Sequence, residues 1–452
     1  MSPSLLKVAE RAQREPYAQF HSLAHLIDVA ALKRAFDRQR TDAAPGIDGV
    51  TKTEYGQDLE RNLQDLHERL RTKRYRHQPI RRVYIPKEGQ PGKERPLGIS
   101  CFEDKIVQDV LREVLEAVYE PDFRDSSYGF RPGRSAHDAL RRLNQVLFQG
   151  EGNWVIEADI ASFFDPLDRS QLVEMIQRRI PDGSLQRLIG KCLHVGILDG
   201  EELTTPDRGT TQGSVLSPIL GNIYLHQVLD RWFEEEIQPR LRGKACLIRY
   251  ADDFALLFQR QDDAQRVMEV LDKRMARFGL RLQPEKTRLI PFQRPPREQT
   301  EGKGPATFDF LGFTWYGQRS RKGHWVPRCK TRKARLQRMI DRIYHWGRTH
   351  RHPSIPEQHA ALGRRLRGHY NYFGVNGNIR SLVALDRQAQ RAWYKGLRRR
   401  SQRTRLTEAR FGDLLRDFPL PRPRIVVSLW GPSSRAVSTE EPDGGNLQVR
   451  IW

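Results

Sequence analysis

Three aspartates at the ends of apolar runs are the residues in this sequence best suited to chemistry. Asp252 and Asp253 stand side by side between the apolar residues 246–250 and 254–258, and Asp159 closes another apolar run upstream. An acidic pair alone indicates little, because such pairs are common in exposed turns. Here the flanking runs predict buried strands, so the carboxylates would lie at strand ends in a chain of net charge +22.

If these carboxylates converge, their repulsion in a partly buried site would be costly unless divalent cations neutralise it. Magnesium fits, because it is a hard ion that one or two carboxylates hold while substrate phosphates supply other ligands. Two such ions about 4 Å apart recur in enzymes of in-line phosphoryl displacement. The residues therefore predict a nucleotidyl transferase, and Lys87 and Arg95 in a basic hairpin are candidates for binding the incoming triphosphate.

Hydrophobic periodicity predicts the elements that must position these carboxylates. Residues 81–99 indicate two short strands across a Gly/Pro turn, and residues 102–119 indicate a helix. Residues 154–159 indicate a strand, and residues 264–278 a helix that ends at Gly279. Strand, helix, hairpin and helix in this order favour an α+β sheet domain.

Changes in composition indicate where the chain divides. A polar, Pro/Gly-rich stretch at 293–305 precedes the apolar residues 308–315, for which we predict a strand. From residue 330 onward the chain is strongly basic and helical in pattern. About the last 20 residues contain few apolar positions, so we expect a poorly packed tail.

Composition limits the classes of function. The 452 residues include 78 Lys and Arg against 56 Asp and Glu, which indicates a polyanionic partner or, less simply, a solvated basic surface. A mean hydropathy of −0.70 and the lack of a long apolar stretch exclude a membrane-spanning helix. Charged residues near the N-terminus do not fit a secretory peptide, so we expect a cytosolic protein. The four cysteines lie far apart and predict neither a disulfide framework nor a zinc site.

Eight motifs, in family order over about residues 40–315, resemble the reverse-transcriptase blocks of bacterial group II intron-encoded proteins. The order of all eight is far more specific than any one of them. The motifs are TDAAPGIDGV at 41–50, RPLGI at 95–99, YGFRPGR at 128–134, DIASFFD at 159–165, GTTQGSVLSP at 209–218, YADD at 250–253, GLRLQPEKT at 279–287 and FLGF at 310–313.

The basic C-terminal region continues the resemblance, because residues 367–378, Trp393, 397–401 and 418–423 are similar to the maturase, or thumb, domain. The resemblance implies an α+β right-hand polymerase with an antiparallel sheet in its fingers and palm, followed by a helical thumb. The implied domains are an N-terminal helical extension at 1–40, fingers and palm at 41–315, a thumb or maturase domain at 330–425 and a tail at 426–452. That tail is too short for an HNH endonuclease, so the chain resembles the compact, endonuclease-lacking members often called class C.

The resemblance also implies roles for single residues. Asp159, Asp252 and Asp253 would be the catalytic metal ligands, with the Ile160 backbone carbonyl as a further ligand. Phe164 would be either the aromatic gate that disfavours a 2′-hydroxyl or a core aromatic. The other implied substrate-binding residues are Lys87 and Arg95 at the triphosphate, Gln212 and Gly213 in the nucleotide pocket and Lys286 near the primer.

A basic segment at residues 391–405 is the candidate RNA-binding surface. Basic side chains follow phosphates, and interleaved aromatic rings can stack on unpaired bases. A solvated helix with core aromatics is the alternative interpretation. The candidate nucleic-acid-binding residues are Trp393, Lys395, Arg398, Arg399, Arg400, Arg403 and Arg405.

Two departures from the family pattern lie near the first aspartate. Ala161-Ser162 stands where many relatives carry Lys-Gly, and Arg169 stands where they carry His. Both leave the carboxylates intact, so we expect them to affect substrate preference or rate rather than to abolish activity.

The expected function is that of an RNA-directed DNA polymerase that uses two Mg²⁺ ions, binds its group II intron RNA and assists splicing and retrohoming. Its expected partners are intron RNA, an RNA template with a DNA primer, dNTPs and target DNA. Two alternatives remain open. One is a domesticated or defence-associated reverse transcriptase no longer tied to an intron. The other is an RNA-binding splicing factor without polymerase activity, which the presence of all three carboxylates disfavours.

Overall fold

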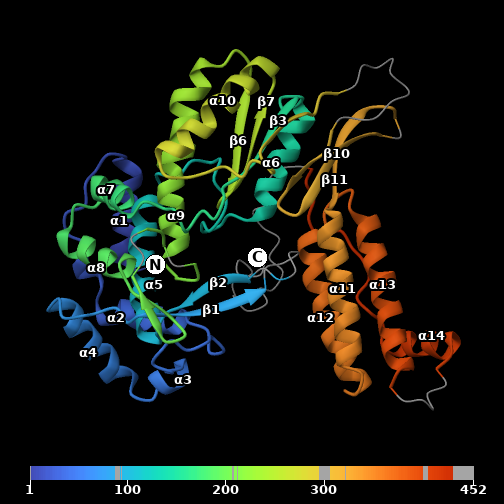
Figure 1. Ribbon diagram of the computed structural model, residues 1–452, viewed down its shortest axis with the longest axis horizontal. Helices are drawn as coiled ribbons and strands as arrows, with labels where there is room; N and C mark the ends of the chain where they lie inside the picture. The colour runs from blue at the N-terminus through green and yellow to red at the C-terminus, as the bar shows by residue number, and fades with distance from the viewer. Residues whose placement is uncertain are drawn as a thin grey trace.

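The computed structural model has a central antiparallel sheet between an N-terminal helical part and a C-terminal helical bundle (Figure 1). The catalytic candidates lie at one end of this sheet. No helix in the part of the chain that the structure describes is long and apolar enough to cross a bilayer. The described residues are 2–86, 92, 94–205, 208–210, 212–294, 306–320, 322–400 and 406–430.

The central sheet has the strand order β6-β7-β3-β8. Its side chains alternate between two faces, as residues of a strand do. Ile156 and Leu256 share a core with residues of α10 on one face, whereas Val155 and Leu257 pack with residues of α6 on the other. Helices therefore cover both faces. The elements are β3 (Trp154–Asp159), β6 (Ala245–Tyr250), β7 (Asp253–Phe258), β8 (Arg288–Pro291), α6 (Ala136–Gln149) and α10 (Gln261–Arg277).

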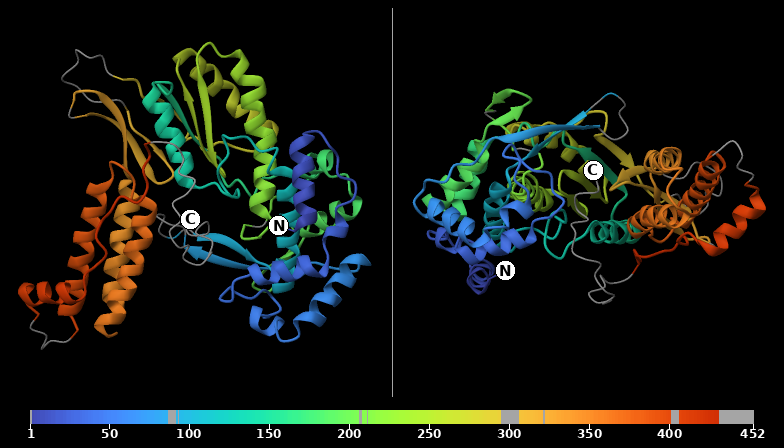
Figure 2. Two further views of the ribbon diagram at one scale, coloured as in Figure 1. Left: turned by 180° about the vertical axis from the view of Figure 1, so that it is seen from behind. Right: turned by 90° about the horizontal axis from the view of Figure 1, so that it is seen from below.

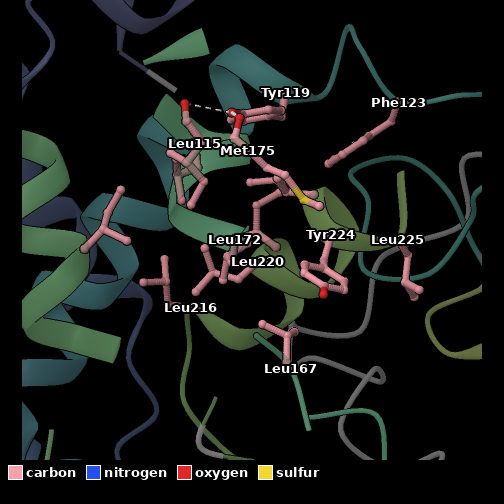
Figure 3. Packing of buried hydrophobic residues seen from close by; sticks show 14 of the residues in the cluster. Leu115, Tyr119, Phe123, Leu167, Leu172, Met175, Leu216, Leu220, Tyr224 and Leu225 are labelled. Carbon is pink, nitrogen blue, oxygen red and sulfur yellow. Dashed lines mark hydrogen bonds between the residues drawn. The ribbon is translucent and has the colours of Figure 1, made fainter. Parts of the chain in front are cut away.

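The N-terminal helical part is built around α5 (Phe102–Tyr119), whose bounds match the predicted helix. Figure 3 shows its Leu115 and Tyr119 packed among residues of α7 and α9, and the Tyr119 hydroxyl donates to the Met175 carbonyl at 3.4 Å. The other helices of this part are α1 (Pro3–Arg14), α2 (Val29–Arg38), α3 (Lys52–Tyr55), α4 (Leu59–Arg71), α7 (Arg169–Arg179), α8 (Gly183–Leu193) and α9 (Ser217–Leu225), which continues into π-helical turns at His226–Asp230 and Trp232–Ile237.

A second sheet carries the predicted basic hairpin. Strands β1 (Ile80–Pro86) and β2 (Glu94–Ile99) pair antiparallel, which confirms the two strands expected within residues 81–99. The short strands β4 (Ile197–Asp199) and β5 (Glu202–Thr204) extend this sheet in the order β2-β1-β4-β5. Lys87, which was assigned to the triphosphate, lies outside the described residues.

The prediction of one strand over residues 308–315 is wrong in one respect, because the chain reverses direction in the middle of this segment. Strand β9 (Phe308–Phe310) is followed by a turn at Leu311 and Gly312, whose φ angles are 49° and 78°. Strand β10 (Phe313–Arg319) then pairs antiparallel with β9. Strand β11 (Trp325–Thr331) then pairs with β10 and leads into the C-terminal bundle. A run of apolar residues conceals such a turn, because both arms are buried.

The C-terminal bundle has its own buried core and stands beside the central sheet rather than on it (Figures 1 and 2). Strands β10 and β11 join it to the rest of the chain, and helix α6 lies next to that junction. Its helices are α11 (Lys333–Thr349), α12 (Ile355–Phe373), α13 (Ile379–Arg398) and α14 (Glu408–Asp417).

Residues 426–430, the described start of the implied tail at 426–452, pack against the body of the protein, whereas the poorly packed stretch expected over about the last 20 residues lies outside the described residues. Leu429 is 4% exposed and donates its N–H to the Asn376 side chain at 2.8 Å, while its carbonyl accepts from the Asn144 side chain of α6 at 3.1 Å. Val427 forms a β-bridge with Val375. Alternate apolar residues give this short segment an inner face, so it returns the chain to the core beside α6.

Candidate active site

The three aspartates lie at the same end of the central sheet. Asp159 is the last residue of β3 and Asp253 the first of β7, and the two are directly opposite one another in the strand register. Asp252 precedes Asp253 in the turn between β6 and β7. Ala251 of this turn has a φ of 56°, in the left-handed region, and Gly129 approaches it so closely that a Cβ there would lie 2.4 Å from the Ala251 nitrogen. A close-fitting backbone thus fixes the turn.

These carboxylates interact electrostatically. Burial, followed by the charges of Asp159 and Asp252, raises the pKa of Asp253 to about 8. Burial also raises the pKa of Asp252 to about 6, with a further increase from Asp159, while the positive charges of Arg95 and Lys286 oppose the increase. The site therefore favours any ligand that adds positive charge.

The donor set fits a hard divalent cation, although Asp159 forms an ion pair with the Lys286 ammonium. Among the residues that the structure describes, no three His, Cys, Asp or Glu side chains are gathered closely enough to form a ready-made metal cluster. The three candidate ligands are nevertheless all carboxylates, and their charges disfavour one another's ionisation until a cation neutralises them. Lys286 thus lies where its charge competes with a cation for Asp159.

The Ile160 carbonyl, the remaining implied ligand, follows Asp159 directly. Ile160 forms an antiparallel bridge with Leu282. On one side of this bridge the Asp159 carbonyl accepts from the Gln283 N–H, and on the other side the Ala161 N–H donates to the opposite segment. In an antiparallel pair of this kind, the carbonyl of the bridged residue points away from its partner. The Ile160 carbonyl is therefore directed away from residue 282.

A cavity of about 260 Å³ lies between β2 and the loop that follows β3. Gln212 lines this cavity, and its carbonyl accepts from the Gly98 N–H at 2.7 Å. Gly213 has a φ of 106°, and a Cβ there would lie 2.6 Å from the Gly98 carbonyl oxygen. The close approach of β2 thus requires glycine at this position, whatever the loop binds.

Phe164 lines the same cavity and is half-buried, so it has features of both predicted roles. Its ring lies edge-on to the buried Phe163 at a centroid distance of 5.0 Å, and it packs against the core. Thr210 also lines the cavity, and among the described residues its buried hydroxyl has no hydrogen-bond partner. A ligand in this cavity would lie beside the Phe164 side chain and Thr210.

The two departures from the family pattern act on the backbone around the cavity. Ser162 has a φ of 48°, a conformation that costs a residue with a side chain about 1 kcal/mol. Glycine, which the family resemblance leads one to expect here, would adopt this conformation without that cost. Arg169 is 5% exposed, and its Nε donates to the Gly209 carbonyl at 2.8 Å, which ties helix α7 to the loop before Thr210.

Arg249 is a structural support of the site that sequence reasoning missed. Its side chain is fully buried and forms an ion pair with Asp230 at 2.6 Å. It also donates to the Ser127 hydroxyl at 2.7 Å and to the Ala251 carbonyl at 3.1 Å, so it holds the turn that carries Asp252. The signal in the sequence was an arginine within an otherwise apolar strand, two residues before the turn alanine.

Helix α13 presents only some of the predicted RNA-binding residues to solvent. Lys395, Arg398 and Arg399 are exposed. Arg400 is half-buried, and its Nε donates to the Arg351 carbonyl at 2.6 Å, so it links the end of α13 to the segment before α12. Arg403 and Arg405 lie outside the described residues.

The prediction that Trp393 stacks on bases is wrong. Its ring is 2% exposed within the bundle core, and its indole N–H donates to the Gln358 side chain at 2.9 Å. A ring enclosed by other helices has no face available to a base. Trp393 therefore belongs to the core interpretation of this segment.

Comparison with known proteins agrees with this arrangement. Residues 85–315, just over half of the chain, match the family "Reverse transcriptase (RNA-dependent DNA polymerase)". The chain is 36% identical over 283 residues to protein YkfC of Escherichia coli, which covers 56% of this chain and 74% of that protein. It is 36% identical over 225 residues to the group II intron-encoded protein LtrA of Lactococcus lactis, 48% of this chain and 37% of LtrA.

A third relative is nuclear intron maturase 2, mitochondrial, of Arabidopsis thaliana, which is 28% identical over 181 residues, 31% of this chain and 24% of the maturase. The chain thus spans most of YkfC but well under half of the two named intron proteins. The matched segment contains all three aspartates and, apart from Arg82, the residues that line the cavity. The chain therefore belongs to the reverse transcriptase family and is related to its group II intron-encoded members.

Proposed function

We propose that this protein is an RNA-directed DNA polymerase that binds group II intron RNA and assists splicing and retrohoming. The observation that carries the proposal is the meeting of Asp159, Asp252 and Asp253 at one sheet end, near a cavity lined by Phe164 and Gln212. Its substrates would be an RNA template, a DNA primer and dNTPs, with target DNA as a further partner. Binding of intron RNA fits a location in the bacterial cytosol.

The three aspartates and the Ile160 carbonyl would hold two Mg²⁺ ions, which when bound supply activation of the attacking hydroxyl and neutralise phosphate charge. The positive charge of Arg95 opposes the increase in the pKa of Asp252, which supports the proposal that this guanidinium binds the triphosphate. Lys87 is proposed for the same role. Lys286, which pairs with Asp159, would release this carboxylate as primer and metal bind.

Phe164 gives a test of the nucleotide pocket. Phe164→Val should raise incorporation of ribonucleotides relative to deoxyribonucleotides by roughly 10-fold or more, because a smaller side chain leaves room for a 2′-hydroxyl. Competition between rNTP and dNTP on an RNA template measures the ratio. Phe163→Val is the matched control, since this ring is buried in the core, and it should lower stability without changing the ratio. An unchanged ratio for Phe164→Val would assign Phe164 to core packing only.

The exposed cations at the end of α13, Lys395, Arg398 and the C-cap residue Arg399, support the proposal of RNA binding. Backbone contacts are the expected mode, because the major groove of A-form RNA is too narrow for side chains to read. Cations that bind phosphates release counterions, so the affinity depends on salt.

The double variant Arg398→Gln/Arg399→Gln should weaken intron RNA binding and flatten its salt dependence. Each lost phosphate contact removes about 0.7–0.9 from the slope of log affinity against log salt. Filter binding at several salt concentrations measures the slope. Arg400→Gln is the control, because its guanidinium donates to a carbonyl inside the bundle, and it should lower stability instead. An unchanged affinity and slope in the double variant would show that this face of α13 is only solvated.

A further inference from the structure

Tyr372 connects the C-terminal bundle to the catalytic aspartates. It lies one residue before the end of α12, and its hydroxyl donates to the Leu311 carbonyl at 2.9 Å. The Leu311 N–H in turn faces Asp253 Oδ2 at 3.4 Å. Leu311 is therefore held from the bundle on its carbonyl side and meets a candidate metal ligand on its amide side.

The turn at Leu311 needs this support. Its φ of 49° is in the left-handed region, which a leucine adopts at a cost of about 1 kcal/mol. Such a conformation persists where its surroundings determine it. Here Phe313, which follows the turn, packs at 5.9 Å from the Tyr372 ring and 5.1 Å from the Phe373 ring. The bundle thus shapes the turn by packing as well as by a hydrogen bond.

Tyr372 is itself fixed from the side of the central sheet. Its backbone carbonyl contacts Nε2 of His137 on α6 at 2.8 Å, an arrangement in which the imidazole donates. The two rings lie 5.6 Å apart. The tyrosine hydroxyl is therefore presented to Leu311 from a defined position at the junction of α6 and α12.

We propose that Tyr372 is a positioning residue for nucleotidyl transfer, which holds Leu311 by its carbonyl so that the N–H of this residue orients the Asp253 carboxylate. The proposal rests on the polymerase function proposed above and adds the C-terminal bundle to the parts that set the geometry of the aspartates. A shift of α12 relative to the central sheet would reach Asp253 through the backbone of Leu311. The hydroxyl acts through another group, so its loss should alter the use of metal and the rate without removing a contact to nucleic acid.

Tyr372→Phe tests this role, because it removes the hydroxyl and keeps the ring contacts. Tyr344→Phe is the matched control, since the Tyr344 hydroxyl donates to the Gln388 side chain at 3.0 Å within the same bundle. Single-nucleotide extension should show kcat reduced roughly 3- to 10-fold in Tyr372→Phe, the loss expected for one hydrogen bond. Its half-saturating Mg²⁺ concentration should rise, while the Kd for primer–template stays the same. Tyr344→Phe should match the parent protein in all three quantities.

Equal kcat and equal Mg²⁺ dependence in Tyr372→Phe and the parent would overturn the proposal. A weaker Kd for primer–template at unchanged kcat would also overturn it, because Tyr372 would then be a nucleic-acid contact. Thermal unfolding of both variants separates loss of stability from loss of position: equal melting temperatures with a reduced kcat in Tyr372→Phe alone support the positioning role. Failure of the parent protein to extend a primer would refute the polymerase function itself and is distinct from all these results.

Discussion

Asp253→Asn should abolish primer extension on an RNA template and leave RNA binding nearly unchanged. The substitution removes a carboxylate that would bind metal, while the basic surfaces remain. Metal ions contribute several kcal/mol to such reactions, so the rate should fall by about 10³-fold or more. Primer extension in Mg²⁺ measures the loss, and Asp252→Asn should behave in the same way. Asp58→Asn, at an exposed carboxylate of the N-terminal helical part, is the control and should extend normally. Undiminished synthesis by Asp253→Asn would remove it from the catalytic site.

The same variant has a pH-dependent consequence in EDTA. The pKa of Asp253 is about 8 in the fold, whereas an unfolded chain gives aspartate a pKa of about 4. The folded state therefore binds the proton more tightly. Its contribution to stability is complete below about pH 4 and is lost as the pH rises towards 8. Asparagine does not titrate, so the melting temperature of Asp253→Asn should fall less between pH 5 and 8 than that of the parent protein.

Arg249→Met should lower the free energy of unfolding by about 3–5 kcal/mol, because it leaves Asp230 charged and unpaired in the core. Urea denaturation measures the change. The double variant Arg249→Met/Asp230→Leu should recover much of the loss, since replacing both partners of a buried pair with apolar groups is often nearly neutral. Arg40→Met breaks an exposed pair with Asp42 and should change stability little. A small effect of Arg249→Met would mean that water or other groups compensate Asp230.

The carboxylates could be located from sequence because the signal is local. Asp159, Asp252 and Asp253 directly adjoin runs whose alternating residues face two cores, and strand pairing then brings the ends of β3 and β7 together. The order of the eight motifs identified the family, which agrees with the match over residues 85–315. Local pattern and family order therefore sufficed for β3, β6 and β7 and for the acidic end of the sheet, whereas β8 was not predicted.

Other features depend on contacts between distant segments. Trp393 was expected to stack on bases because basic residues surround it in sequence, but Gln358 on another helix and the bundle core enclose it. The turn at Leu311 is invisible in an apolar run, because its left-handed conformation is supported by residues of α12. Arg249 has its counter-charge on Asp230, in the π-helical turn after α9. Periodicity within one segment carries no information about such partners.

The return of residues 426–430 to α6 places both chain crossings between the C-terminal bundle and the body of the protein beside the same helix. One is β11, which packs against α6, and the other is the pair of bonds from Arg141 and Asn144 of α6 to the carbonyls of Ser428 and Leu429. Together with the contacts of Tyr372 to Leu311 and His137, these crossings hold the bundle at the junction beside α6. Both crossings lie beside α6. An exchange of the segment between them with that of a related chain would therefore join the two chains at neighbouring places and would leave the central sheet and its aspartates intact.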